Sequence, residues 1–196
     1  MVDVVERVEA LVVALDLYAD VGGHIEEAQL AIASPCAGWS VRDVIAHSVG
    51  VIHKFAAFAR GETDEPRTPT GDLLGGDHRL AMCLAAAEGA AAWSHADLSR
   101  HCRLPFGTFA ADVAAGINLF DVLAHTWDLA SAVGMTLGGS DELWRAGLEA
   151  ALLVVGPHRD AAHYGEALPA RPDDPPRTQL LAFLGRVEAA PPPPGT

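Results

Sequence analysis

The sequence is poor in lysine and in the patterns that mark β-strands. Lys54 is the single lysine among 196 residues, the formal net charge is −13, and no basic cluster occurs. A chain of this charge suits neither nucleic acid nor an anionic membrane surface, so we expect neither as a partner. Apolar runs also stay short of the roughly 18 residues that a membrane-spanning helix needs.

Cysteine is scarce as well. Cys36, Cys83 and Cys102 are an odd number of cysteines, and none of them forms a C-x-x-C motif. This argues against a disulfide framework and for a reducing compartment. Residues 1–7 (MVDVVER) lack the basic lead and small-residue cleavage site of a signal peptide. We therefore expect a cytoplasmic protein.

Helical spacing of apolar residues runs through most of the chain, of which 50% is hydrophobic. We predict an all-α fold, a four-helix bundle with additional short C-terminal helices. One metal-binding domain is expected over residues 1–190, followed by a loose proline-rich tail at residues 191–196. The expected helices span residues 3–21, 41–60, 77–97, 109–133, 141–155 and 178–187, with residues 101–107 as an extended connection.

Some helix ends and buried faces can also be predicted. Ser40 and Asp43 form a Ser-x-x-Asp capping pattern before the second helix, and Gly61 suits its C-terminal end. The pair Gly22-Gly23 is expected to interrupt the first helix. The inward face of the third helix is expected to carry the apolar residues Leu80, Cys83, Leu84, Ala87 and Ala91.

The fourth helix carries an acid and a histidine in the middle of an apolar run. Asp121 and His125 are four residues apart, so both project from one face of that helix. A carboxylate and an imidazole on an inward face are costly unless they satisfy each other or share a ligand. The pair therefore indicates either a hydrogen-bonded pair at the edge of the core or part of a metal site.

His47 is the best candidate for a third ligand, because it borders the apolar face of the second helix. The alternative is a satisfied core histidine. Two imidazoles and one carboxylate would leave coordination positions open, as catalytic metal sites do. These donors suit one divalent ion, Zn²⁺ first, with Ni²⁺, Fe²⁺ or Mn²⁺ as alternatives. Such an ion could activate a bound water or thiol.

Two segments carry a resemblance to a known superfamily. They are residues 34–47 (SPCAGWSVRDVIAH) and residues 121–130 (DVLAHTWDLA). Both resemble signatures of the DinB-like superfamily, which includes the N-terminal domain of mycothiol-dependent maleylpyruvate isomerase. Residues 180–186 (LLAFLGR) resemble the end of its actinobacterial single-domain metal-binding branch.

The resemblance implies a four-helix bundle that holds one divalent metal through His47, Asp121 and His125. Asp121 stands where the isomerase has a glutamate, and this shorter side chain could alter the coordination geometry or the metal preference. Characterised members often use a low-molecular-weight thiol such as mycothiol in thiol transfer or isomerisation. A small-molecule substrate is implied, and we also consider a homodimer as the assembly.

Four further residues could contribute to a site formed by these three ligands. His53 could serve as a catalytic acid–base group at the mouth of the site, and the alternative is an ordinary helix residue. Asp128, three residues after His125, could orient one imidazole nitrogen or form a salt bridge. Trp39 could staple the loop to the bundle or form a pocket wall. Cys36 is expected to have a packing role rather than a nucleophilic one.

These observations favour a metal-dependent enzyme, a thiol-dependent transferase or isomerase acting on a small electrophilic or carbonyl substrate. One alternative is a thiol-independent enzyme of secondary metabolism that uses the metal as a Lewis acid. Another is a non-catalytic protein that binds a metal or small ligand, and a third is a bundle that has lost its metal.

Overall fold

The computed structural model describes residues 4–159 and 165–188 of the chain. The predicted tail at residues 191–196 lies outside the described residues. In chain order the elements are α1 (Val4–His24), a 3-10 turn η1 (Glu27–Gln29), α2 (Val41–Ala59), α3 (His78–Ser94), β1 (His101–Leu104), β2 (Gly107–Ala110), α4 (Ala111–Ala132), α5 (Asp141–His158) and α6 (Pro176–Phe183).

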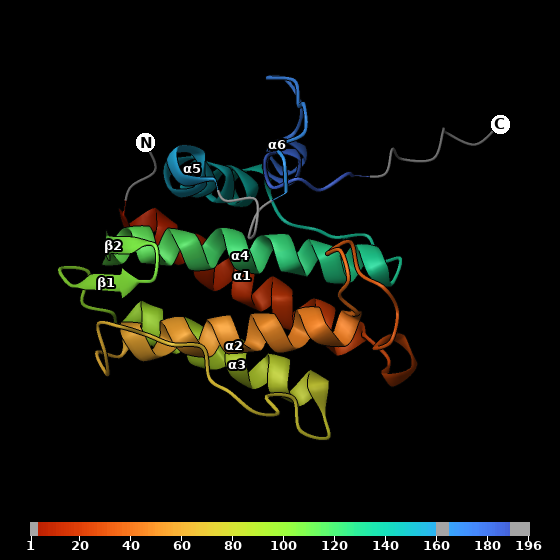
Figure 1. Ribbon diagram of the computed structural model, residues 1–196, viewed down its shortest axis with the longest axis horizontal. Coiled ribbons are helices and arrows are strands. Elements are labelled where there is room, and N and C mark those ends of the chain that lie inside the picture. The colour runs from red at the N-terminus through yellow and green to blue at the C-terminus, as the bar shows by residue number, and fades with distance from the viewer. Residues whose placement is uncertain (1–3, 160–164, 189–196) are drawn as a thin grey trace.

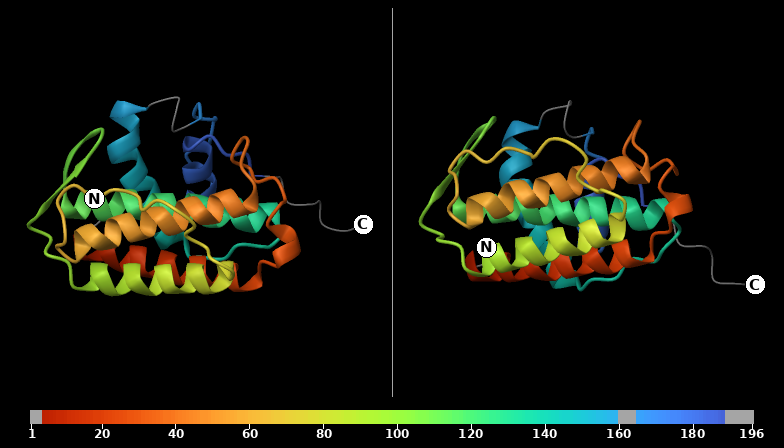
Figure 2. Two further views of the ribbon diagram at one scale, coloured as in Figure 1. Left: turned by 60° about the horizontal axis from the view of Figure 1, so that its bottom comes forward. Right: turned by 90° about the horizontal axis from the view of Figure 1, so that it is seen from below.

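Four long helices form a bundle in which α1 and α2 each contact both α3 and α4 (Figure 1). Helices α5 and α6 cover the side of α4 that faces away from α2 and α3, as the turned views also show (Figure 2). The predicted all-α bundle with added C-terminal helices is thus confirmed. Within the described residues, no helix is long and apolar enough to cross a membrane.

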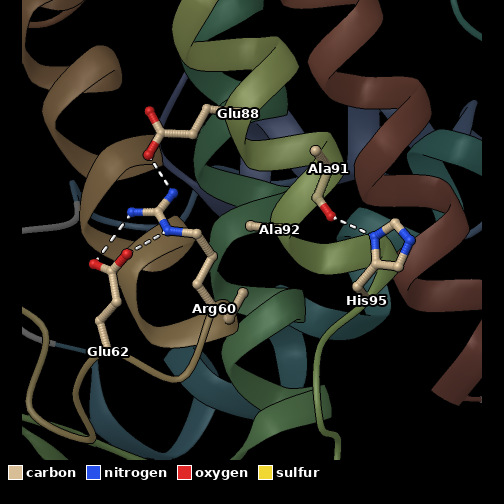
Figure 3. Close-up of a pocket in the computed structure, with 7 residues that line it drawn as sticks. Arg60, Glu62, Glu88, Ala91, Ala92 and His95 are labelled. Carbon is tan, nitrogen blue, oxygen red and sulfur yellow. Dashed lines mark hydrogen bonds and ion pairs between the residues drawn. The ribbon is translucent and has the colours of Figure 1, made fainter.

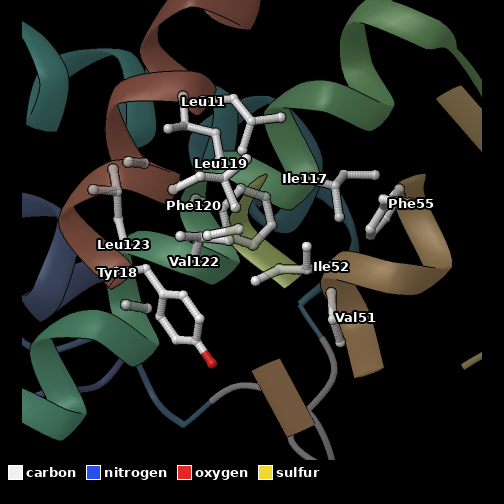
Figure 4. Close-up of a cluster of buried hydrophobic side chains, with 14 of the residues drawn as sticks. Leu11, Tyr18, Val51, Ile52, Phe55, Ile117, Leu119, Phe120, Val122 and Leu123 are labelled. Carbon is white, nitrogen blue, oxygen red and sulfur yellow. The ribbon is translucent and has the colours of Figure 1, made fainter. Parts of the chain in front are cut away.

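The core lies where α1, α2 and α4 meet (Figure 4). Leu11 and Tyr18 enter it from α1, Ile52 from α2, and Phe120 and Leu123 from α4, and all five are buried. Their recurrence at helical spacing explains why these segments fold as helices with one buried face. This packing fixes α2 beside α4, and these two helices carry the candidate ligands.

The predicted start of α2 is confirmed in detail. The Ser40 hydroxyl accepts a hydrogen bond from the backbone N–H of Asp43, and the Asp43 carboxylate accepts one from the backbone N–H of Ser40. This reciprocal capping box fixes the first turn of the helix. The helix ends at Ala59, and Gly61 follows two residues later with a φ of 81°. Glycine adopts this backbone conformation without strain, as the sequence pattern predicted.

The expected break at Gly22-Gly23 is wrong, because α1 continues through both residues to His24. A Cβ atom on Gly22 would come within 2.7 Å of the Met82 side chain. Glycine at this position therefore permits close packing of α1 on α3 rather than ending the helix.

The expected inward face of α3 is also wrong. Leu80, Cys83, Leu84, Ala87 and Ala91 are exposed, and the opposite face, with Met82, Ala85, Ala86, Gly89 and Trp93, is buried. In an alanine-rich helix both faces are apolar, so spacing alone does not choose between them. Packing decides, because a Cβ atom on Gly89 would come within 2.9 Å of Ile52, which shows how closely α3 approaches α2.

The connection before α4 is more ordered than the sequence suggested. Strands β1 and β2 pair antiparallel, with His101 opposite Ala110 and Leu104 opposite Gly107. The hairpin buries Cys102 and Leu104 and leaves Phe106 at its exposed tip. It closes one end of the bundle, at the left of Figure 1.

Candidate metal centre

The structure brings together the three residues that the sequence singled out as ligands. His47 comes from α2, and Asp121 and His125 come from neighbouring turns of α4. Asp121 Oδ1 lies 3.7 Å from His47 Nε2 and 3.8 Å from His125 Nε2. One donor atom from each of the three residues lies within 4.8 Å of the other two. Two helices thus direct an N, O, N donor set at one point.

The spacing of these donors fits a shared cation better than direct hydrogen bonds. Direct N–H···O bonds are about 2.7–3.2 Å long, and both contacts of Asp121 Oδ1 are longer. Donors bound at about 2.0–2.1 Å to a tetrahedral ion lie roughly 3.3 Å apart, close to the observed separations. The other oxygen, Asp121 Oδ2, is buried and has no hydrogen-bond partner within the described residues. An unpartnered buried carboxylate oxygen is costly, and a cation would remove that cost.

The electrostatics of the site match this arrangement. Burial alone would raise the pKa of Asp121, but the nearby imidazoles of His125 and His47 hold it below its ordinary value. Burial alone would lower the pKa of His47, but Asp121 outweighs it and raises that pKa. The Asp121 side chain is 22% exposed, that of His47 33% and that of His125 10%, so the site opens on the His47 side.

Asp128 fixes the orientation of the His125 ring. Its Oδ2 atom lies 2.9 Å from His125 Nδ1. Because a carboxylate only accepts, Nδ1 donates this hydrogen bond, and Nε2 keeps its lone pair on the side of Asp121. Asp128 is completely buried. Although burial alone would raise its pKa, the hydrogen bonds from His125 and Arg186 hold the pKa of Asp128 well below its usual range.

Arg186 was not predicted from the sequence. It follows α6, and its Nη2 and Nε atoms donate to the two oxygens of Asp128, at 2.8 and 3.3 Å. The same guanidinium lies 3.5 Å from Cys36 Sγ. Asp128 therefore forms both of the contacts proposed for it, the hydrogen bond to an imidazole nitrogen and a salt bridge. The only sequence signal for Arg186 was its place at the end of the segment 180–186.

Cys36 belongs to this network, which the sequence reasoning did not foresee. Its thiol donates to Asp128 Oδ2 at 3.0 Å. Burial, followed by the charge of Asp128, raises the pKa of Cys36 to about 12. The residue therefore acts as a protonated hydrogen-bond donor and not as a thiolate nucleophile. It ties the loop before α2 to α4.

Cys36, His125 and Asp128 form a second group of donors close enough to hold an ion. This group is the poorer candidate. Both oxygens of Asp128 are already engaged by Arg186, and a guanidinium within hydrogen-bond distance would repel a cation. In the described part of the chain, Asp121 forms an ion pair with no arginine or lysine, and it keeps a carboxylate oxygen without a partner.

Trp39 lies against both imidazoles. Its ring centre is 5.0 Å from that of His47 and 6.3 Å from that of His125, and it is nearly parallel to the latter at 15°. The indole is 37% exposed, so it forms part of the surface around the donors. The expected roles of loop staple and pocket wall both fit this position.

His53 lies away from the three donors. Its Nδ1 atom pairs with Glu88 of α3 at 2.7 Å. The side chain therefore faces the α2–α3 side of the bundle. Its acid–base role remains a prediction, and this ion pair favours the alternative of a partly buried helix residue.

Lys54 is a further group that the sequence reasoning left unused. It is half-buried on α2, two turns after His47, and its burial lowers its pKa. Its ammonium lies 5.4 Å from the centre of the Phe55 ring and forms no ion pair within the described part of the chain. Its charge opposes protonation of His47, so it acts electrostatically on the donor set.

The sequence matches a known domain family and two curated proteins. A sequence model of the mycothiol maleylpyruvate isomerase N-terminal domain matches residues 13–130. The uncharacterized protein Rv0738 of Mycobacterium tuberculosis is 32% identical over 176 residues, which cover 89% of this chain and 94% of that protein. A counterpart from a second strain of the species gives the same figures.

Two solved structures share the fold. The crystal structure of the mycothiol-dependent maleylpyruvate isomerase superposes with a TM-score of 0.56 at 17% identity, over 74% of this chain and 68% of the isomerase. A histidine-to-alanine mutant of the isomerase gives 0.60 at 14% identity, over 85% and 75% of the two chains. The range matched by the family contains the three donors and Asp128, and it ends before Arg186.

Proposed function

Because this chain belongs to the mycothiol maleylpyruvate isomerase N-terminal domain family, we propose that it is a divalent-metal-dependent enzyme of that kind. We propose that it uses mycothiol, a low-molecular-weight thiol, in a transferase or isomerase reaction on a small electrophilic or carbonyl substrate. The observation that carries the proposal is the Asp121 carboxylate. Its Oδ1 atom lies 3.7 and 3.8 Å from two imidazole Nε2 atoms, and its buried Oδ2 atom has no hydrogen-bond partner within the described residues.

In this proposal His47, Asp121 and His125 hold the ion, Zn²⁺ first and Ni²⁺, Fe²⁺ or Mn²⁺ as alternatives. Bound there, a divalent ion would lower the pKa of a coordinated thiol or water and so supply a nucleophile near neutral pH. The chain's own residues do the positioning. Asp128 holds the Nδ1 proton of His125 and leaves Nε2 free for the ion.

The surroundings favour a small, negatively charged substrate. Trp39 offers an apolar wall beside both histidines. Lys54 is a half-buried ammonium without an ion-pair partner in the described residues, in a protein of net charge −13. A carboxylate on the substrate or on the thiol would satisfy that charge. Three free cysteines within the described residues suit a reducing cytoplasm, where such thiols are kept reduced.

The first experiment measures metal content. Purified protein, stripped with a chelator and reloaded with each ion, should hold about one ion per chain. His125→Ala should lose it, whereas His24→Ala, which replaces an exposed histidine at the end of α1, should retain it. Stoichiometric metal in Asp121→Ala would contradict the ligand set.

The second experiment separates an enzyme from a metal-binding protein. Consumption of a model electrophile should require both the metal and mycothiol, and it should disappear in His125→Ala. Turnover with metal but without any thiol would favour the Lewis-acid alternative. Metal binding with no turnover of any substrate tested would favour a non-catalytic protein.

A further inference from the structure

The outward face of α3 carries an uncharged apolar stripe. It consists of Leu80, Cys83, Leu84, Ala87 and Ala91, which we call the α3 stripe. Leu80 is 53% and Leu84 58% exposed. The five positions lie within about 100° of one another around the helix. Glu88 turns aside toward α2, where it pairs with Arg60 and His53.

The uncharged α3 stripe contrasts with the acidic character of the chain. The chain has a net charge of −13, and the neighbouring helix α1 exposes Glu9, Asp16 and Asp20. A contiguous apolar strip on an acidic protein marks a contact surface. Two copies could approach there without placing like charges opposite each other.

We propose that the α3 stripe is the contact between two copies of this chain in a twofold-symmetric, antiparallel pair of α3 helices. The spacing of its four outermost residues, 80–84–87–91, reads the same in both directions as steps of four, three and four. An antiparallel copy therefore places Leu80 opposite Ala91 and Leu84 opposite Ala87. Each leucine meets an alanine, which is the large-against-small fit that lets two helices pack closely.

The ends of the stripe support the same pairing. Asp77, the N-cap of α3, then lies opposite Ser94 and one residue from His95, the C-cap, in the second copy, so that an acid comes close to a base at both ends. Ala91 and His95 border a hollow of about 570 Å³ between α2 and α3, whose lining also includes the ion-paired residues Arg60, Glu62 and Glu88 (Figure 3).

The size of the surface sets the expected affinity. Twelve residues of helix are about 18 Å long, and a stable interface buries roughly 800 Å² on each partner. The stripe alone offers less than this, and the rim of the hollow adds to it. We therefore expect a dissociable dimer with a dissociation constant in the micromolar range and not an obligate one.

Sedimentation equilibrium of the full chain from about 1 to about 200 µM tests the proposal. A monomer–dimer equilibrium should appear and should tighten as salt rises, because salt screens the repulsion between two acidic copies. Leu84→Glu should weaken dimerisation about a hundredfold or more, since the carboxylate would be buried against Ala87. Leu152→Glu, at a leucine of α5 that is 48% exposed, is the matched control and should dimerise as the parent does.

A crosslinking measurement checks the register. The two Cys83 residues of the dimer lie about five residues apart along the paired helices, roughly 8 Å along the axis. A short bifunctional maleimide should link them, and Cys83→Ser should abolish the link, because Cys36 is only partly exposed and Cys102 is buried. A monomer at every concentration would overturn the proposal, as would a dimer that survives Leu84→Glu or a crosslink that survives Cys83→Ser. None of these measurements requires bound metal.

Discussion

Removing Arg186 should destabilise the fold through a carboxylate 58 residues away in the sequence. Arg186→Met leaves Asp128, which is 0% exposed, without its cationic partner. Breaking a buried ion pair by removing one partner costs about 3–5 kcal/mol. Asp128 keeps its hydrogen bonds to His125 and Cys36, so we expect the lower end of this range, about 3 kcal/mol. In a chain of this size that corresponds to a fall in Tm of about 6–12 °C.

The assay is urea unfolding of the metal-free protein, followed by circular dichroism. The matched control is Arg171→Met, which breaks an ion pair with Asp173 whose side chains are 77% and 71% exposed. Exposed pairs contribute little, so the control should change the unfolding free energy by less than about 0.5 kcal/mol.

A second substitution isolates the cause. If the loss of stability in Arg186→Met comes from the unpaired buried charge of Asp128, adding Asp128→Asn should restore part of the free energy of unfolding. Arg186→Met alone should also weaken zinc binding, by about tenfold to a hundredfold, because Asp128 would hold His125 less firmly. A loss below about 1 kcal/mol, or no recovery in the double variant, would refute the reasoning.

Three further predictions concern the ligands and the packing. Because Asp121 raises the pKa of His47, zinc binding should release a proton, and the affinity for zinc should rise from about pH 6 to about pH 8. In the metal-free protein the pairing of His47 with Asp121 should stabilise the fold below the ordinary histidine pKa. This stabilisation should be lost as the pH rises through the raised pKa of His47. Gly89→Ala should cost about 1–3 kcal/mol through overpacking against α2, whereas Gly23→Ala, with no atom within 4 Å of its new Cβ, should stabilise the chain by about 0.4–1 kcal/mol in thermal unfolding. His53→Ala should keep stoichiometric metal. It should lower the free energy of unfolding by less than about 1 kcal/mol, because the ion pair of His53 with Glu88 is partly exposed to solvent. Loss of the metal would contradict the position of His53 away from the three donors.

Local patterns predicted the features that depend on neighbouring residues. The capping box at Ser40 is a short-range hydrogen-bond pattern, so the start of α2 followed from four residues. The donors Asp121 and His125 share a helix face by spacing alone. The third donor, His47, required the bundle, and the resemblance of the two signature segments supplied that connection.

Other features depended on packing and could not be read from spacing. Both faces of α3 are apolar, and only the close approach of Gly89 to Ile52 determines which one is buried. The pair Gly22-Gly23 looked like a helix end because glycine lowers helix propensity, and tertiary contacts outweighed that preference. Arg186 and Cys36 meet although they are 150 residues apart in the sequence. No periodicity links such residues before the chain is folded.

The ion pair between Arg186 and Asp128 connects the C-terminal segment of the chain to the donor set. Arg186 lies beyond residues 13–130, the range that the family model matches, and Asp128 lies within that range. A change that moves the Arg186 guanidinium would alter the contact of Asp128 with His125 without replacing any of the three donors. The segment after α6 is thus coupled, through Asp128, to the orientation of the His125 ring.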